Sequence, residues 1–212
     1  MRLTILNFSF FLLIAIKAYG QNNPEATKIL DRFSATALGA PSVSIKFHLI
    51  TTDQMENTND TLAGSLILSK DKYKLDLPDN SIWFNGETSW SYLPAENEVT
   101  ITKADKKDNS FQNRPSSIFT MYNSGYKSKL IEERSSYFII DLYPEDIKSD
   151  LLRIRLSIGK SLMDLISLEY KKRDGILITL KVDEYNLKVK TDKNTFVFKP
   201  VNIKEVEVID MR

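Results

Sequence analysis

The chain has no cysteine and only one histidine among its 212 residues. The absence of cysteine excludes disulfide bonds, thiol catalysis and metal sites built on thiolates. A single histidine excludes any site that needs two imidazole side chains. We therefore expect neither a metal site nor a cofactor. With 42% apolar and 27% charged residues, the composition is instead that of an ordinary globular domain with a sizeable core.

Long apolar runs are also lacking, except at the N-terminus. The run Leu3–Ile16 follows Arg2 and precedes Ala18-Tyr19-Gly20, which has small residues where a signal peptidase cuts. The run is shorter than the ~20 residues that cross a bilayer, which favours a signal peptide over a membrane anchor. We expect residues 1–20 to be cleaved and residues 21–212 to form one domain. An exported chain without cysteine is typical of the bacterial periplasm.

The charge is nearly balanced, with 29 Lys and Arg against 28 Asp and Glu. Removing the signal peptide takes away Arg2 and Lys17 and no acid, so the mature chain carries a net charge of 27 − 28 = −1. Binding to nucleic acid requires a basic surface that neutralises phosphates. We therefore expect no nucleic acid partner.

The spacing of apolar residues changes once along the chain. Between Pro24 and Leu38 they recur at offsets of three and four, which predicts an amphipathic helix ending at Gly39. After that, apolar and polar residues alternate, which predicts strands with one apolar face. The alternating segments are 43–49, 72–77, 137–142, 153–158, 166–171 and 176–182.

Turn signals between these segments predict antiparallel hairpins. Asp174-Gly175 suits a two-residue type I′ turn, and Asn85-Gly86 and the polar stretch Thr51–Asp60 suit further hairpin loops. Lys103–Arg114 is predicted to be a loop, and Pro115–Tyr122 a short helix. The predicted fold class is α+β, a single curved antiparallel sheet or half-barrel of about 9–11 strands. Two or three helices are expected to cover its concave apolar face.

Motifs for catalysis are absent or incomplete. Gly159-Lys160-Ser161 resembles the end of a phosphate-binding loop, but Ile154 stands where that loop needs glycine. His48 lies on the polar side of its segment, without a nucleophile motif nearby. The acids between Asp53 and Asp60 lack the regular spacing of a calcium loop. We therefore expect a protein that is not an enzyme, and a hydrolase is the least favoured alternative.

Three blocks in order are more specific. They are Gly64-Ser65-Leu66-Ile67-Leu68, then Asn85-Gly86 with Trp90-Ser91-Tyr92-Leu93-Pro94, and finally Phe196-Val197-Phe198-Lys199-Pro200 with Val206–Asp210. This order resembles the outer-membrane lipoprotein carrier (LolA) family. The resemblance implies an unclosed half-barrel with helices in its concave side. It also implies a monomeric periplasmic carrier that takes acylated lipoproteins from an inner-membrane ABC-type complex to an outer-membrane acceptor.

Such a carrier needs an apolar concavity, because each methylene group exposed to water costs about 0.8 kcal/mol. The alternating strand faces supply the candidates, and the Pro115 helix supplies a lid. Plain core packing is the alternative for each of these side chains. The predicted lipid-binding residues are Leu66, Leu68, Tyr73, Leu75, Trp90, Tyr92, Ile118, Phe119, Met121, Phe138, Ile140 and Leu142.

The resemblance also points to a lid latch. Family members often carry an arginine after the Gly64 strand that holds the lid through hydrogen bonds to helix carbonyls, and Lys70 stands there in this chain. A one-residue shift would bring Lys72 to the same place. Because lysine lacks the planar fork of arginine, we expect a weaker or differently built latch.

A second class of function has the same half-barrel. A periplasmic sensor or glycolipid-binding module would recognise a lipid, a lipopolysaccharide or a mislocalised lipoprotein without shuttling it. Sensing relatives usually append a second domain. Since the sequence given stops soon after the Val206–Asp210 block, we expect the carrier.

Overall fold

The computed structural model describes residues 23–103, 114–199 and 205–212. The expected signal peptide and most of the expected 103–114 loop lie outside the described residues. Within them the chain forms one α-helix, α1 (Pro24–Gly39), and two short 3-10 helices, η1 (Pro115–Phe119) and η2 (Met121–Asn123). No helix in these ranges is long and apolar enough to cross a membrane.

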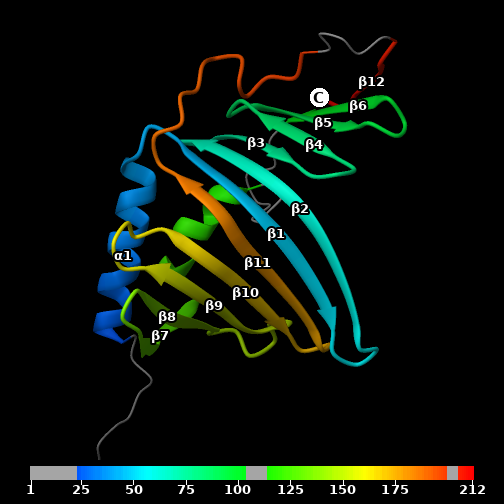
Figure 1. Ribbon diagram of the computed structural model, residues 1–212. Coiled ribbons are helices and arrows are strands. Elements are labelled where there is room, and N and C mark those ends of the chain that lie inside the picture. The colour runs from blue at the N-terminus through cyan, green and yellow to red at the C-terminus, as the bar shows by residue number, and fades with distance from the viewer. Residues whose placement is uncertain (1–22, 104–113, 200–204) are drawn as a thin grey trace, which may run out of the picture.

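All strands belong to one sheet (Figure 1), ordered β12-β6-β5-β4-β3-β2-β1-β11-β10-β9-β8-β7. Neighbours pair antiparallel except β12 and β6, which are parallel. The strands are β1 (Val43–Asp53), β2 (Thr58–Ser69), β3 (Lys72–Asp76), β4 (Ser81–Phe84), β5 (Thr88–Leu93), β6 (Glu98–Lys103), β7 (Tyr126–Glu133), β8 (Tyr137–Pro144), β9 (Leu151–Gly159), β10 (Leu165–Lys172), β11 (Ile176–Asn186) and β12 (Glu207–Asp210).

The sheet is a single open one, as predicted, but its predicted strand number is wrong and the predicted helix number is not confirmed. It has twelve strands rather than 9–11, since short segments such as β4 carry too few residues to show a clear alternation. The described residues hold one α-helix rather than two or three. Pro115–Tyr122 forms two 3-10 turns, because Ile118 and Phe119 are both drawn into the core within one short segment.

Helix α1 begins where the sequence predicts. The Asn23 side chain caps it by accepting hydrogen bonds from the backbone N–H groups of Glu25 (3.0 Å) and Ala26 (2.9 Å). The backbone N–H of Asn23 also donates to the carbonyl of Ser128 on β7 at 3.0 Å. The buried face of α1 therefore meets the sheet beside β7, and Phe33 packs on Phe119 with ring centroids 5.3 Å apart.

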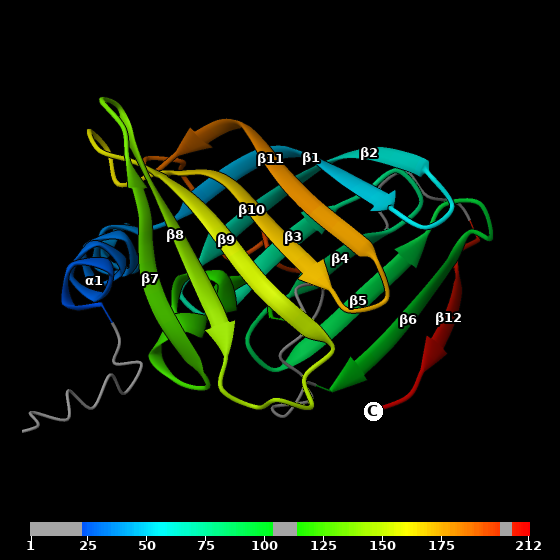
Figure 2. The same ribbon diagram turned by 90° about the horizontal axis from the view of Figure 1, so that it is seen from below.

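Strand register defines the two faces of the sheet. We call the concave face of the sheet the inner face (Figure 2). Helix α1 and the 3-10 helices η1 and η2 pack against it. Leu66 pairs with Ile45 and Leu75 on this face, and Leu168 pairs with Leu156 and Leu180. The opposite, outer face carries the polar residues between them. The alternation in the sequence thus assigns these strands to the correct faces.

Strands β4 to β6 depart from that pattern, because their outer face is also apolar. Trp83 pairs with Trp90, and Tyr92 pairs with Val99. Phe198, from the segment after β11, packs on Trp83 and Tyr92 with ring centroids 5.3 and 5.6 Å apart. The C-terminal segment therefore covers the outer side of β4 and β5.

The three predicted hairpins form, but their loops differ in detail from the prediction. The loop between β10 and β11 has three residues rather than two, with Gly175 at φ +89° and the Asp174 carboxylate accepting from the Ile176 N–H. The loop at Asn85-Gly86 is likewise three residues long. Much of the polar stretch Thr51–Asp60 is strand, because β1 continues to Asp53 and β2 begins at Thr58.

Gly64 is required by a close approach rather than by a turn. A Cβ atom there would lie 2.6 Å from the ring of Phe47 and 2.9 Å from a methyl group of Leu77. We predict that Gly64→Ala lowers the free energy of unfolding by about 1–3 kcal/mol, measured by urea denaturation. Gly39→Ala is the control, since nothing lies within 4 Å of its added carbon. An equal stability of both variants would contradict this account.

Candidate functional site

The inner face is not completely filled. A cavity of about 730 Å³ lies between the sheet and the η1–η2 segment. Its volume falls in the range of natural small-molecule sites. Its apolar lining comes from five strands, η2 and the β3–β4 turn, and consists of Phe47, Leu49, Leu75, Leu77, Met121, Leu151, Ile154, Leu168, Ile178 and Leu180.

Polar side chains complete the lining. Five of them are not tyrosines, and we call these five the polar rim: Arg114, Ser117, Thr120, Ser124 and Lys172. Arg114, Thr120 and Ser124 are exposed, whereas the apolar lining is buried or half-buried. An apolar floor with a polar rim suits a ligand with a long apolar part and a polar end.

Two tyrosines also line the cavity, Tyr126 from β7 and Tyr170 from β10. Burial raises the pKa of the Tyr170 phenol well above its usual range, and the nearby Tyr126 raises it further. Burial also raises the pKa of Tyr126. Both phenols therefore stay neutral at physiological pH and act as hydrogen-bond donors or acceptors.

The η1–η2 segment forms one wall of the cavity. It contributes Ser117, Thr120 and Met121, while the neighbouring Phe119 is anchored against Phe33 of α1. A second anchor is the Tyr122 hydroxyl, which donates to the Asp31 carboxylate of α1 at 2.8 Å. The position of this wall therefore depends on α1.

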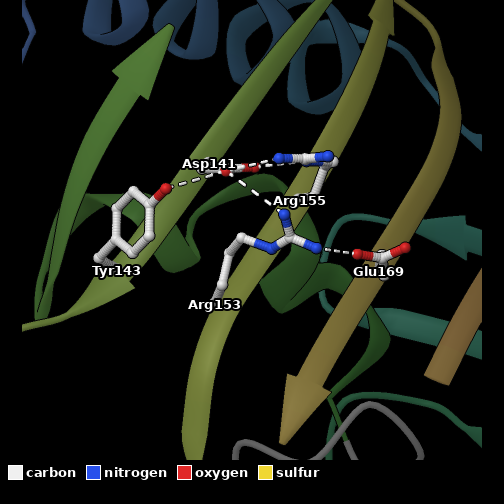
Figure 3. A network of polar contacts seen from close by, with 5 residues as sticks. All are labelled: Asp141, Tyr143, Arg153, Arg155 and Glu169. Atoms are coloured by element: carbon white, nitrogen blue, oxygen red, sulfur yellow. Dashed lines mark hydrogen bonds and ion pairs between the residues drawn. The ribbon is translucent and has the colours of Figure 1, made fainter. Parts of the chain in front are cut away.

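Opposite the η1–η2 segment, the cavity wall is formed by the sheet. On the outer face of this part of the sheet, an ion-pair network joins neighbouring strands (Figure 3). Asp141 on β8 is 1% exposed and accepts two hydrogen bonds from Arg155 on β9, at 2.7 and 2.9 Å. Arg153 lies 3.6 Å from Asp141 and also pairs with Glu169 on β10. The Tyr143 hydroxyl donates to Asp141 at 3.0 Å. The network thus joins β8, β9 and β10 behind Ile154, Leu168 and Tyr170.

The structure places the twelve predicted lipid-binding residues in four groups. Leu75 and Met121 line the cavity. Trp90 and Tyr92 lie on the outer face of β5, because their partners Trp83 and Val99 belong to that face. Phe138 is half-buried against the core. The others are buried core residues, namely Leu66, Leu68, Tyr73, Ile118, Phe119, Ile140 and Leu142.

Most of the cavity lining was not among the predicted residues. Phe47, Leu49, Ile154, Leu168, Tyr170, Ile178 and Leu180 all belong to segments whose alternation predicts strands. The alternation shows on which face of the sheet a side chain lies, but it does not show whether a helix packs against that side chain. Helix α1 and η1 cover one part of the inner face, and the uncovered part lies over β1, β3 and β9–β11.

Lys70 lies at the turn between β2 and β3, with φ +56°. Its side chain is exposed and borders a small pocket with Ala37, Leu38 and Ala40 at the C-terminal end of α1. Lys72, the alternative, is the first residue of β3 and is also exposed. The latch at Lys70 stays a prediction.

No metal site is evident in the described part of the chain. No three His, Asp or Glu side chains there are grouped so that they could hold a metal ion. His48 lies on the outer face, with its Nδ1 atom 2.7 Å from an oxygen of Asp183, and both side chains are largely solvent-accessible. This pair is separated from the cavity by the sheet itself.

Comparisons with known proteins agree with the geometry. The sequence profile described as outer membrane lipoprotein carrier protein LolA matches residues 16–158, more than half of the chain. No curated protein matches. An uncharacterized conserved protein from Thermus thermophilus has a similar structure, with a TM-score of 0.59, 14% identity, and coverage of 88% of this chain and 99% of that one. MucB is similar with a TM-score of 0.51 and 12% identity, over 88% of this chain and 66% of that one. These likenesses show a shared fold.

The Asp141 network gives a stability prediction. Asp141→Asn leaves Arg155 and Arg153 without their shared buried carboxylate, so we expect the free energy of unfolding to fall by about 2 kcal/mol. Glu184→Gln is the control, because the Lys46–Glu184 pair is exposed and such pairs contribute roughly 0–1 kcal/mol. Equal effects of the two substitutions in urea denaturation would show that the network adds nothing.

The Tyr122–Asp31 contact gives a pH prediction. Burial, and then the hydrogen bond to Asp31, raise the pKa of Tyr122 to about 12 from 10.0. The neutral phenol is favoured in the folded state, so its contribution is complete below pH 10 and is lost as the pH rises through 12. We expect Tyr122→Phe to weaken the fall in unfolding free energy between pH 10 and 12. An unchanged slope would disprove the assignment.

Proposed function

The chain belongs to the family of the outer membrane lipoprotein carrier protein LolA, and from this membership we propose that it is a periplasmic carrier of acylated lipoproteins. In this proposal, residues 1–20 export the protein. It then receives its cargo from an inner-membrane ABC-type releasing complex and delivers it to an outer-membrane acceptor. It acts as a monomer and catalyses no reaction.

The apolar cavity is the observation that carries the proposal. A methylene group occupies about the volume of a water molecule, roughly 30 Å³, so the 730 Å³ cavity has room for about 24 of them. Burying a chain of about 16 carbons is worth about 13 kcal/mol relative to water. The cavity therefore offers one acyl chain an environment comparable to a bilayer, which a carrier needs in order both to accept and to release it.

The η1–η2 wall supports a route for release. It is held by the Phe33–Phe119 contact and the Tyr122–Asp31 hydrogen bond, both to α1. A shift of α1 would move this wall and change the cavity. Lys70 borders a small pocket at the C-terminal end of α1, which supports the proposal that it acts as the latch in this movement.

A sensor that binds a lipid or glycolipid with the same half-barrel is the second candidate. It is favoured by the edge strand β12, where Val208 is 57% exposed and Ile209 38% exposed. An edge strand with exposed apolar side chains suits pairing with a partner protein. A sensor would bind acyl chains but would not deliver them.

The test is release and delivery of a radiolabelled acylated lipoprotein. We expect the purified protein to release it from inner-membrane vesicles and pass it to outer-membrane vesicles, and not to hold the unacylated form. Ile178→Trp fills the cavity and should reduce the released fraction about tenfold. Leu177→Trp, on the same strand with its side chain on the outer face, is the control.

Three outcomes are distinguishable. Loss of release in Ile178→Trp but not in Leu177→Trp supports acyl binding in the cavity. Release without delivery favours the sensor over the carrier. Full release by Ile178→Trp, or equal binding of the unacylated form, would overturn the proposal.

A further inference from the structure

Strand β10 presents a graded series of side chains to the cavity. Leu168, Tyr170 and Lys172 are two residues apart and all line it, so apolar, phenolic and cationic groups follow one another along one face. Leu168 lies opposite Leu180, and Tyr170 lies opposite Ile178. The cavity therefore has an apolar end and a polar end in a fixed order.

The phenols near the middle of this series have hydrogen-bonding capacity to spare. Among the described residues, no hydrogen bond is found for the Tyr170 hydroxyl or the Tyr126 hydroxyl, and both side chains are half-buried and line the cavity. A tyrosine hydroxyl in such a position usually finds a hydrogen-bond partner, since it can both donate and accept. Two such groups in one apolar cavity therefore favour a ligand that brings an oxygen acceptor to them.

Lys172 adds positive charge at the polar end of this series. Among the described residues it pairs with the Asp174 carboxylate, whose oxygen is 3.5 Å from Nζ, and both side chains are partly solvent-accessible. Such a pair is weak and leaves the ammonium group available to a stronger anionic partner. Arg114 also lies at the rim.

The volume indicates the size of the apolar part of the ligand. About 24 methylene groups fit, which is enough for one chain of about 16 carbons. The cavity thus suits one such chain with its polar end at Lys172.

We propose that the cavity binds one acyl chain with an anionic head group, a carboxylate or a phosphate, which accepts hydrogen bonds from Tyr170 and Tyr126 and pairs with Lys172. The inference rests on the proposed function only in that the cavity holds an acyl chain; the chains of a lipoprotein end in neutral ester and amide links, so the anionic amphiphile is a second ligand of the same cavity. It adds the orientation of the chain, with its methyl end toward Leu168 and Leu180, and a preference for negative charge.

Displacement of a fluorescent apolar probe tests the inference with three ligands of equal chain length: palmitate, hexadecyl phosphate and hexadecanol. We expect at least one of the two anions to bind about tenfold more tightly than the alcohol, and Lys172→Met to remove most of that difference. Tyr170→Phe should weaken the anion severalfold and leave hexadecanol unchanged. Lys171→Met is the control, because its side chain lies on the outer face opposite Arg153.

The outcomes separate this inference from the proposed function. Preference for palmitate alone supports a carboxylate head group, and preference for hexadecyl phosphate alone supports a phosphate. Equal binding of all three ligands, unchanged in Lys172→Met, would overturn the head-group assignment while acyl binding stands. Failure of every ligand to displace the probe would overturn both.

Discussion

The structure depends on an excess of apolar surface on the inner face of one curved sheet. Helix α1 and the 3-10 turns pack on part of that face, and the core there is closed around Phe33 and Phe119. Over β1, β3 and β9–β11 the η1–η2 segment faces the sheet across a cavity instead of packing on it. A sheet of this size must curve, and its curvature makes the unpacked part a cavity rather than an exposed apolar patch.

The outer face explains how such a cavity persists. A wall without packing on one side loses contacts that would otherwise hold its strands together. Here the ion pairs of Asp141, Arg153, Arg155 and Glu169 join β8, β9 and β10 from the other side. On β4 and β5, Phe198 packs on Trp83 and Tyr92 and so joins these two strands from the outer side. Both supports hold together strands that lack packing on the cavity side.

Much of the fold could be predicted from the sequence, because its signals are local. The offsets of Ile29, Leu30 and Phe33 predict α1, and strict alternation predicts the long strands and their faces. The site could be predicted only in part. Trp90 and Tyr92 alternate with serines as an inward-facing pair would, but both lie on the outer face, where Phe198, about a hundred residues later, packs on Tyr92. Which inner residues stay uncovered depends on where α1 docks, and no local pattern contains that contact.

Native mass spectrometry of the protein purified from its native cells measures the central claim most directly. The account predicts a complex heavier than the polypeptide by one acylated species, which dissociates when the cavity is filled by substitution on the inner face of β11. Only the mass of the bare polypeptide, even after incubation with acylated lipoprotein in membrane vesicles, would contradict the claim that this cavity exists to hold an acyl chain.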